Sequence, residues 1–150
     1  GVLLNNNLEF IDRLNEIVYP DGALLLGSRG TATLFLGDVR VATNVRLFEG
    51  GRAIGTRVSA AVHSSVLDEG QTWLDRAFVV TDWYVSGYEP LVDSHGRRVG
   101  MLYVGFLEAP FAAARRGALA VVVGPDSPLE QVFRAFALRY QQFTFAISRP

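Results

Sequence analysis

The stretch from Asp82 to Phe106, DWYVSGYEPLVDSHGRRVGMLYVGF, constrains the fold more than any other part of the chain. It predicts two long strands joined by a tight turn at Asp93-Ser94-His95-Gly96. Gly96 can adopt the positive φ that such turns favour, so the pattern indicates a β-hairpin.

The polar residues of this hairpin fall on one face. Side chains two residues apart in a strand share a face, which places Tyr84, Ser86 and Tyr88 together on the first strand. The alternating positions of the return strand are Val99, Met101, Tyr103 and Gly105. Three tyrosines and a serine on one sheet face indicate the wall of a small-molecule pocket more than an ordinary core.

The composition excludes most catalytic chemistry. The chain has no cysteine and its fourteen basic residues are all arginine, so thiol nucleophiles, thiolate metal sites and lysine Schiff bases are not available. The two histidines, His63 and His95, lack the close spacing of a metal-binding pair. A length of 150 residues fits one domain. The net charge of −1 argues against nucleic-acid binding through a basic face. We therefore expect no catalytic residue, no metal site, no cofactor and no nucleic-acid partner.

Upstream of the hairpin, the chain predicts two helices and three strands. Apolar residues at helical spacing predict a helix over 8–18, with Asn6 as its N-cap and Glu9 completing a capping-box variant. The remaining elements are strands over Thr31–Leu36, Val39–Val45 and Thr72–Val80 and a helix over Ser59–Glu69. This order predicts a PAS-like α+β fold: a five-stranded antiparallel sheet with an N-terminal helix and a helix crossing between strands two and three.

The character of the chain changes after Phe106. Pro110 suits the first position of a helix, and the pattern predicts C-terminal helices over 111–123 and Leu129–Tyr140 and a strand over Phe143–Ile147. We divide the chain into a domain at 1–110 and a C-terminal helical extension at 111–150. The most apolar run, Ala118–Val123, is far shorter than the roughly 20 residues of a membrane-spanning helix. Because the sequence starts at Gly1, we expect it to be part of a longer protein.

Five motifs occur in an order that resembles the single-Cache domains. They are RVATNV (Arg40–Val45), RAIGTRVS (Arg52–Ser59), the step Val66, Leu67 and Gly70, YEPLVD (Tyr88–Asp93) and GMLYVG (Gly100–Gly105). The resemblance covers about Leu8 to Phe111. Single-Cache domains are extracytoplasmic PAS-like sensor modules of bacterial histidine kinases, chemoreceptors and diguanylate cyclases.

The resemblance implies a location in the periplasm, in a membrane-anchored receptor with one transmembrane helix before the domain and one after it. The segment LEAPFAAARRGALAVVV resembles the exit helix that leads to the second span. The chain departs from the family pattern at Gly124-Pro125-Asp126, which interrupts this segment before a span is completed.

The resemblance also implies a ligand pocket between the sheet and the crossing helix. Carried onto this sequence, its ligand-binding candidates are Arg57, Arg76, Tyr84, Ser86, Tyr88 and Tyr103. A guanidinium can bind a carboxylate in bidentate fashion, and neutral hydroxyl groups then discriminate ligand shape. Since tyrosine and serine occupy the positions where citrate-sensing relatives carry basic clusters, we expect a small monocarboxylate or a neutral polar ligand.

Each candidate also has a structural interpretation. Tyr84 and Tyr88 would then be half-buried sheet residues, and Tyr103 a core residue with one satisfied hydroxyl. Arg57 would pair with Glu89 or Asp93, and Arg76 would face outward.

Two other classes of function compete with the sensor. A ligand-free PAS-like module would act through dimerisation or through contact with a partner protein. In the first case the domain would form a homodimer. An enzyme would have only carboxylate or serine chemistry available, and the acidic residues of the hairpin form no recognisable acid–base pair.

Overall fold

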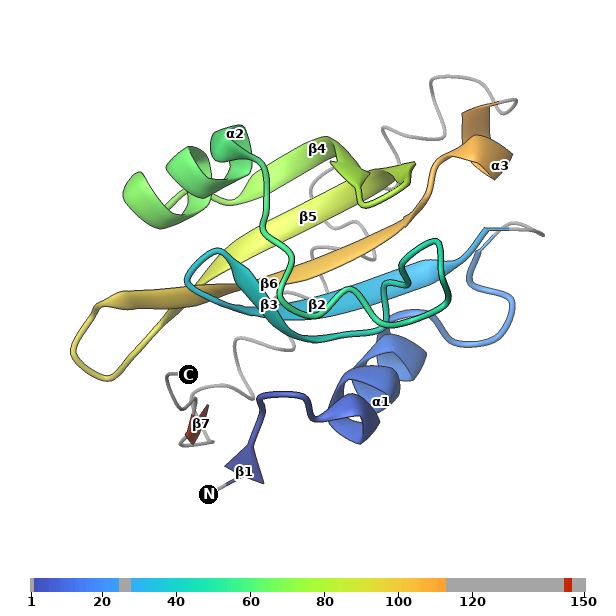
Figure 1. The fold of residues 1–150 in the computed structure, drawn as a ribbon. Helices are drawn as coiled ribbons and strands as arrows, with labels where there is room; N and C mark the ends of the chain where they lie inside the picture. The colour runs from blue at the N-terminus through green and yellow to red at the C-terminus, as the bar shows by residue number, and fades with distance from the viewer. Residues whose placement is uncertain (1, 25–27, 113–144, 147–150) are drawn as a thin grey trace.

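The computed structural model describes residues 2–24, 28–112 and 145–146 (Figure 1). The first half of the chain forms β1 (Val2–Leu3), α1 (Leu8–Val18), β2 (Gly30–Leu36), β3 (Val39–Thr43), α2 (Ala60–His63) and the π-helical turn η1 (Ser64–Asp68). The second half forms β4 (Trp73–Val79), β5 (Asp82–Val92), β6 (Arg98–Leu107), α3 (Ala109–Ala112) and β7 (Phe145–Ala146).

The centre of the fold is a five-stranded antiparallel sheet with the order β3-β2-β6-β5-β4. In Figure 1, α1 and α2 lie on opposite sides of this sheet. The α2–η1 segment connects β3 to β4, so it joins the two edge strands across one face. These features confirm the predicted PAS-like α+β fold.

Helix α1 spans the predicted residues, but its N-cap lies one residue later than the sequence pattern suggests. Asn7, not Asn6, is the N-cap, because its side-chain oxygen accepts a hydrogen bond of 3.0 Å from the backbone N–H of Phe10. Asn6 instead adopts a φ of 54° and donates its backbone N–H to the carbonyl oxygen of Val41 at 2.6 Å. Asn6 thus turns the chain from β1 into the helix, and the cap falls on its neighbour.

The crossing helix is shorter and less regular than the predicted span of 59–69. Ser59 caps α2, accepting a hydrogen bond of 3.4 Å from the N–H of Val62. After one turn the helix widens into η1, and Gly70 ends it with a φ of 73°, as expected of a helix C-terminus. Arg98 on β6 donates to the carbonyl oxygens of Leu67 and Asp68, which holds the end of η1 against the hairpin.

The hairpin forms as predicted, with β5 paired to β6 from Tyr84 opposite Leu107 to Val92 opposite Arg98. Its turn is closed by Asp93, whose carboxylate accepts hydrogen bonds from the backbone N–H groups of His95 and Arg97 at 2.8 and 3.0 Å. These bonds, led by that from Arg97, lower the pKa of Asp93 to about 2. Gly96 has a φ of 77°, the positive value expected from the sequence.

Two separate apolar clusters cover the two sheet faces. The cluster beside α1 is built around Ile11, Leu34, Leu102, Val104 and Phe106. The cluster beside α2 and η1 is built around Phe35, Val62, Val66, Tyr88, Met101 and Tyr103. Strand β6 contributes to both, because successive side chains of a strand point to opposite faces.

The termini meet in a short parallel pair, in which Val2 lies opposite Phe145 and Leu3 opposite Ala146. Of the predicted C-terminal elements, α3 shows the start of the first helix, and β7 lies within the predicted strand 143–147. The rest of 111–123 and all of 129–140 lie outside the described residues, so the division at residue 110 stays a prediction. Within the described part of the chain, no helix has the length and apolar character needed to cross a membrane.

Close packing of β6 against β2 gives a test of the central register. A Cβ at Gly100 would overlap the backbone carbonyl oxygen of Phe35. Since a backbone atom cannot rotate away, we expect Gly100→Ala to lower the free energy of unfolding by about 1–3 kcal/mol or more. Urea denaturation of the purified domain measures this change.

Gly51→Ala is the matched control, because a Cβ at Gly51 meets no heavy atom within 4 Å and its φ is not positive. It should leave the urea midpoint nearly unchanged. Equal stability of the two variants would show that β2 and β6 are not packed in this register.

Candidate ligand pocket

A pocket of about 260 Å³ opens between the α2 side of the sheet and the chain that leads into α2. Its polar lining consists of Arg40, Thr56, Arg57, Ser59 and Tyr88. Its apolar lining consists of Val58, Val62, Ala77, Phe78 and Val80. In the part of the chain that the structure describes, the lining therefore holds two cationic side chains and no acidic one. The volume suits a metabolite of a few heavy atoms, being smaller than typical sites for drug-sized ligands.

Arg40 on β3 is the most unusual residue of the lining. It is only 3 % exposed, and its Nη1 donates hydrogen bonds to the hydroxyl of Thr56 at 2.7 Å and to the carbonyl oxygen of Arg57 at 3.5 Å. Its guanidinium lies 5.0 Å from the centre of the Phe35 ring. The buried Nε has no hydrogen-bond partner among the described residues, and burial lowers the pKa of the group. Arg40 is thus a buried cation without a carboxylate partner in the described part of the chain.

Sequence reasoning missed Arg40 as a site residue, although it begins the first family motif. The available signal was its position between Val39 and Val41 in an apolar strand. Charged side chains are rarely buried without a partner, so a charged residue at such a position is unusual. The strand pattern could not say which face Arg40 occupies.

Arg57 lies at the rim of the pocket, with a side chain that is 66 % exposed. Its Nη1 pairs with the carboxylate of Asp38 at 2.5 Å, so the predicted partners Glu89 and Asp93 are wrong. The reason is that Asp38, in the β2–β3 turn, lies beside the chain entering α2, where Arg57 forms an isolated bridge with Val39. Burial alone would raise the pKa of Asp38, but hydrogen bonds and charge from Arg57 and His63 hold it below its ordinary value.

Of the three predicted site residues on β5, which are Tyr84, Ser86 and Tyr88, the pocket lining includes Tyr88. Burial raises the pKa of Tyr88 to about 12, and the charge of Arg40 opposes the rise. Ser86 is fully buried and donates to the carbonyl oxygen of Tyr84 at 3.4 Å. Tyr84 is half-buried and packs against the same apolar cluster. The lining residues do not include Tyr84 or Ser86.

Tyr103 lies behind the pocket. It is fully buried, its ring centre is 4.8 Å from that of Tyr88, and its hydroxyl shares a hydrogen bond of 2.9 Å with the hydroxyl of Thr31. Desolvation raises the pKa of Tyr103 well above its ordinary value. Tyr103 therefore packs against Tyr88. It is a core residue whose hydroxyl has a hydrogen-bond partner, as its structural interpretation expects.

Arg76 is not brought to the pocket. Its neighbours Ala77 and Phe78 are lining residues, but Arg76 is not among them, and its side chain is 55 % exposed. Its Nε pairs with Glu108 at 2.7 Å, and its guanidinium lies 4.8 Å from the centre of the Trp83 ring. This is the outward placement that the strand alternation left open.

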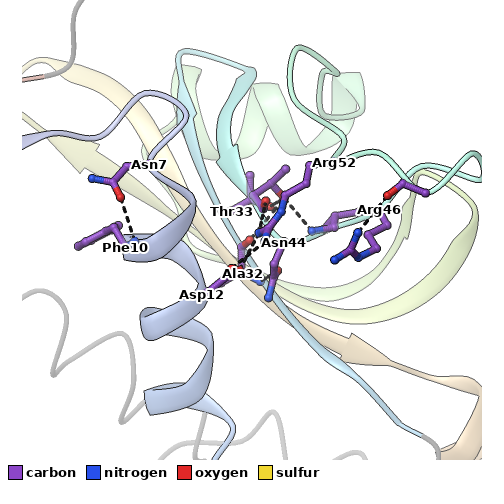
Figure 2. A network of polar contacts seen from close by, with 11 residues as sticks. Asn7, Phe10, Asp12, Ala32, Thr33, Asn44, Arg46 and Arg52 are labelled. Atoms are coloured by element: carbon purple, nitrogen blue, oxygen red, sulfur yellow. Dashed lines mark hydrogen bonds and ion pairs between the residues drawn. The ribbon is translucent and has the colours of Figure 1, made fainter.

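The segment between β3 and α2 carries Thr56, Arg57 and Ser59, and a polar network fastens it to α1 (Figure 2). Arg52 binds both carboxylate oxygens of Asp12 in α1, at 2.6 and 2.7 Å, and also donates to the carbonyl oxygen of Thr43 at 3.0 Å. The hydrogen bond from Arg52 is the main cause that lowers the pKa of Asp12. The segment that lines the pocket is therefore joined by an ion pair to α1, the helix on the other face of the sheet.

Among the described residues, no three His, Asp or Glu side chains are grouped so that they could hold a metal ion. This side of the sheet carries an apolar cluster, and the buried side chain of Arg40 lies beside it at the pocket. The arrangement is that of a binding pocket, with donors for an anion and an apolar wall.

The family model described as single Cache domain 3 matches residues 2–118. Comparisons with curated proteins and with solved structures give no match. Cache domains are non-catalytic sensor domains of signalling proteins; they bind small molecules and are typically the extracytoplasmic parts of membrane receptors. The five-stranded sheet, the N-terminal helix and the crossing helix agree with this assignment. The chain belongs to the single Cache domain 3 family and is a PAS-like sensor domain.

Proposed function

We propose that this domain senses a small organic acid as the extracytoplasmic part of a membrane-anchored bacterial receptor, such as a histidine kinase or a chemoreceptor. The observation that carries the proposal is the charge of the pocket: among the described residues, its lining includes Arg40 and Arg57 and no acidic side chain. A pocket with this lining favours an anion, since guanidinium–carboxylate hydrogen bonds are among the strongest that proteins make.

The rest of the lining suits a ligand with a short carbon skeleton. Val58, Val62 and Val80 offer an apolar wall, while Ser59 and Tyr88 add hydroxyl groups. Hydroxyl groups at fixed positions discriminate among acids by shape and by hydrogen-bonding pattern. An acid of two to four carbons, about the size of lactate, matches both the wall and the volume.

A sensor also needs two arrangements whose stabilities the ligand changes by different amounts. The pocket connects with both terminal helices. Strand β6 runs from the layer beneath Tyr88 directly to α3, and the pocket segment is joined to α1 through Arg52 and Asp12. We propose that ligand binding moves this segment relative to the sheet, and that α1 and α3 pass the movement to the membrane.

Ligand binding gives the first test. A thermal-shift screen of the purified domain with short carboxylic acids should reveal at least one that raises Tm. A ligand at a hundred times its Kd adds about 2.7 kcal/mol of stability, which corresponds to a rise of roughly 5–10 °C for a domain of this size.

Tyr88→Phe should weaken the effect without loss of the apolar packing on Tyr103. If no acid, amine or nucleobase raises Tm and a crystal structure shows the pocket filled by side chains, the sensor proposal fails. The domain would then be the ligand-free dimerisation module, which a homodimer mass in size-exclusion chromatography would support.

Signal transmission gives the second test. Asp12→Asn removes the charge that Arg52 binds but touches no residue of the pocket lining. We therefore expect the full receptor carrying Asp12→Asn to bind its ligand nearly as tightly as wild type and to lose most of its ligand-dependent output. Glu16→Gln is the matched control, because Glu16 is an exposed residue of the same helix. Equal output from both variants would exclude this route.

The same ion pair predicts a pH dependence of stability. Because the pKa of Asp12 is lowered in the folded state, the pair stabilises the fold above the unfolded-state pKa of about 3.9, and the stabilisation is lost as pH falls through the lower folded-state pKa. The side chains of Arg52 and Asp12 are 20 % and 44 % exposed, so solvent limits the contribution to about 1 kcal/mol or less. Wild type should be slightly more stable than Asp12→Asn at pH 7, and the difference should shrink as pH falls below about 3.9 in urea titrations. A difference independent of pH would show that the carboxylate charge is not the cause.

A further inference from the structure

We propose that Arg40, and not the more accessible Arg57, binds the charged group of the ligand, and that the ligand is therefore a monocarboxylate with a single negative charge. This inference rests on the proposed function and assigns the residue and the ligand class within that same pocket.

The first argument is the cost of burying Arg40. Its side chain is 3 % exposed, and the carboxylates of the described residues pair with other cations or remain apart from it. A buried charge without a counter-ion is unfavourable by several kcal/mol, which is why such groups are normally paired. The structure places this unpaired cation at the wall of a pocket, where an anionic ligand would supply the missing partner.

The second argument is hydrogen-bonding capacity. A guanidinium has five N–H donors and no acceptor. The hydrogen bonds of Arg40 to described residues use Nη1 alone, with Thr56 and Arg57 as acceptors, and Nε is buried without a partner among those residues. The contacts on Nη1 fix the plane of the group, so it is orientated before a ligand arrives. A fixed guanidinium with unused donors is the arrangement that bidentate carboxylate binding requires.

The third argument is that Arg57 is already neutralised. Its guanidinium pairs with Asp38, which also lies 3.4 Å from His63. Its side chain is mostly exposed to water, where the attraction between charges is weak. An anion at Arg57 would have to displace Asp38 or bind beside it.

These charges define the ligand class. The described part of the pocket offers one uncompensated positive charge, at Arg40, and an apolar wall that includes Val58, Val62 and Val80. A second carboxylate would be desolvated against that wall or repelled by Asp38. Short monocarboxylates should therefore bind more tightly than dicarboxylates of similar length.

The test uses matched probes on the unaltered domain. Propionate, lactate and pyruvate are compared with propionamide and lactamide, which keep the shape and lose the charge, and with malonate and succinate. Isothermal titration should show binding of at least one monocarboxylate, with the corresponding amide and the dicarboxylates weaker by roughly 10- to 100-fold. Equal binding of lactate and lactamide, or tighter binding of succinate, would overturn the inference.

Two variants then separate the arginines. Arg40→Met should weaken binding of the best monocarboxylate by roughly 10- to 100-fold, while Arg57→Gln should change it by less than about threefold. Since an apolar residue replaces an unpaired buried charge, Arg40→Met without ligand should have a Tm no lower than wild type. Loss of binding in Arg57→Gln with retention in Arg40→Met would assign the ligand to Arg57 and sink the inference.

If Arg40→Met fails to fold, the probe comparison on the unaltered domain still tests the ligand class. Arg57→Gln still tests the assignment, because loss of binding in that variant would contradict it. Binding of none of the acids to wild type would contradict the proposed function itself. If a neutral or doubly charged probe binds, and Arg40→Met does not change its affinity, this inference is contradicted and the sensor role is left intact.

Discussion

Strand β6 is buried from Gly100 to Phe106 and hydrogen-bonded to a neighbour on each side. A strand buried on both faces requires a covering layer on each. Helix α1 covers the face of Leu102, Val104 and Phe106, and the α2–η1 segment covers the face of Met101 and Tyr103. The chain between β3 and α2 must therefore cross the sheet on the side away from α1. The pocket forms beneath that crossing chain.

The position of the pocket follows from how the large aromatic side chains fill this layer. Tyr103, Tyr88 and Phe35 pack against one another, with ring centres 4.8 and 6.2 Å apart. Their rings occupy the middle of the sheet, and the open space lies beside them, next to Arg40 and the start of α2. The tyrosine row is thus mainly the support of the site, and only Tyr88 reaches its lining. In the described part of the chain, Arg40 is a buried cation without a carboxylate partner, and such a charge lowers stability unless a counter-ion binds it.

Local patterns were sufficient to predict much of this fold. The hairpin of β5 and β6, the turn at Gly96, the family and the order of the elements depend on alternation, turn residues and short motifs within single segments. The sequence could not give the partners of Arg57 or the face of Arg76, because both depend on how distant segments meet. Alternation groups Leu74, Arg76 and Phe78 on one face of β4, but pairing with β5 decides that this face is opposite to that of Tyr88. Arg40 was missed for the same reason: a charged residue in an edge strand is normally solvated, and only the chain folded over β3 buries it.

The central claim is that the buried guanidinium of Arg40 receives the carboxylate of a small acid. The most direct measurement is a crystal structure of the domain purified in carboxylate-free buffer and then soaked with the short monocarboxylate that raises its Tm most. The account predicts density for the acid in the pocket, with its carboxylate within hydrogen-bond distance of the Arg40 guanidinium and the Arg57–Asp38 pair intact. Density for the carboxylate at Arg57 with Asp38 displaced, or a pocket that stays closed by side chains, would contradict it.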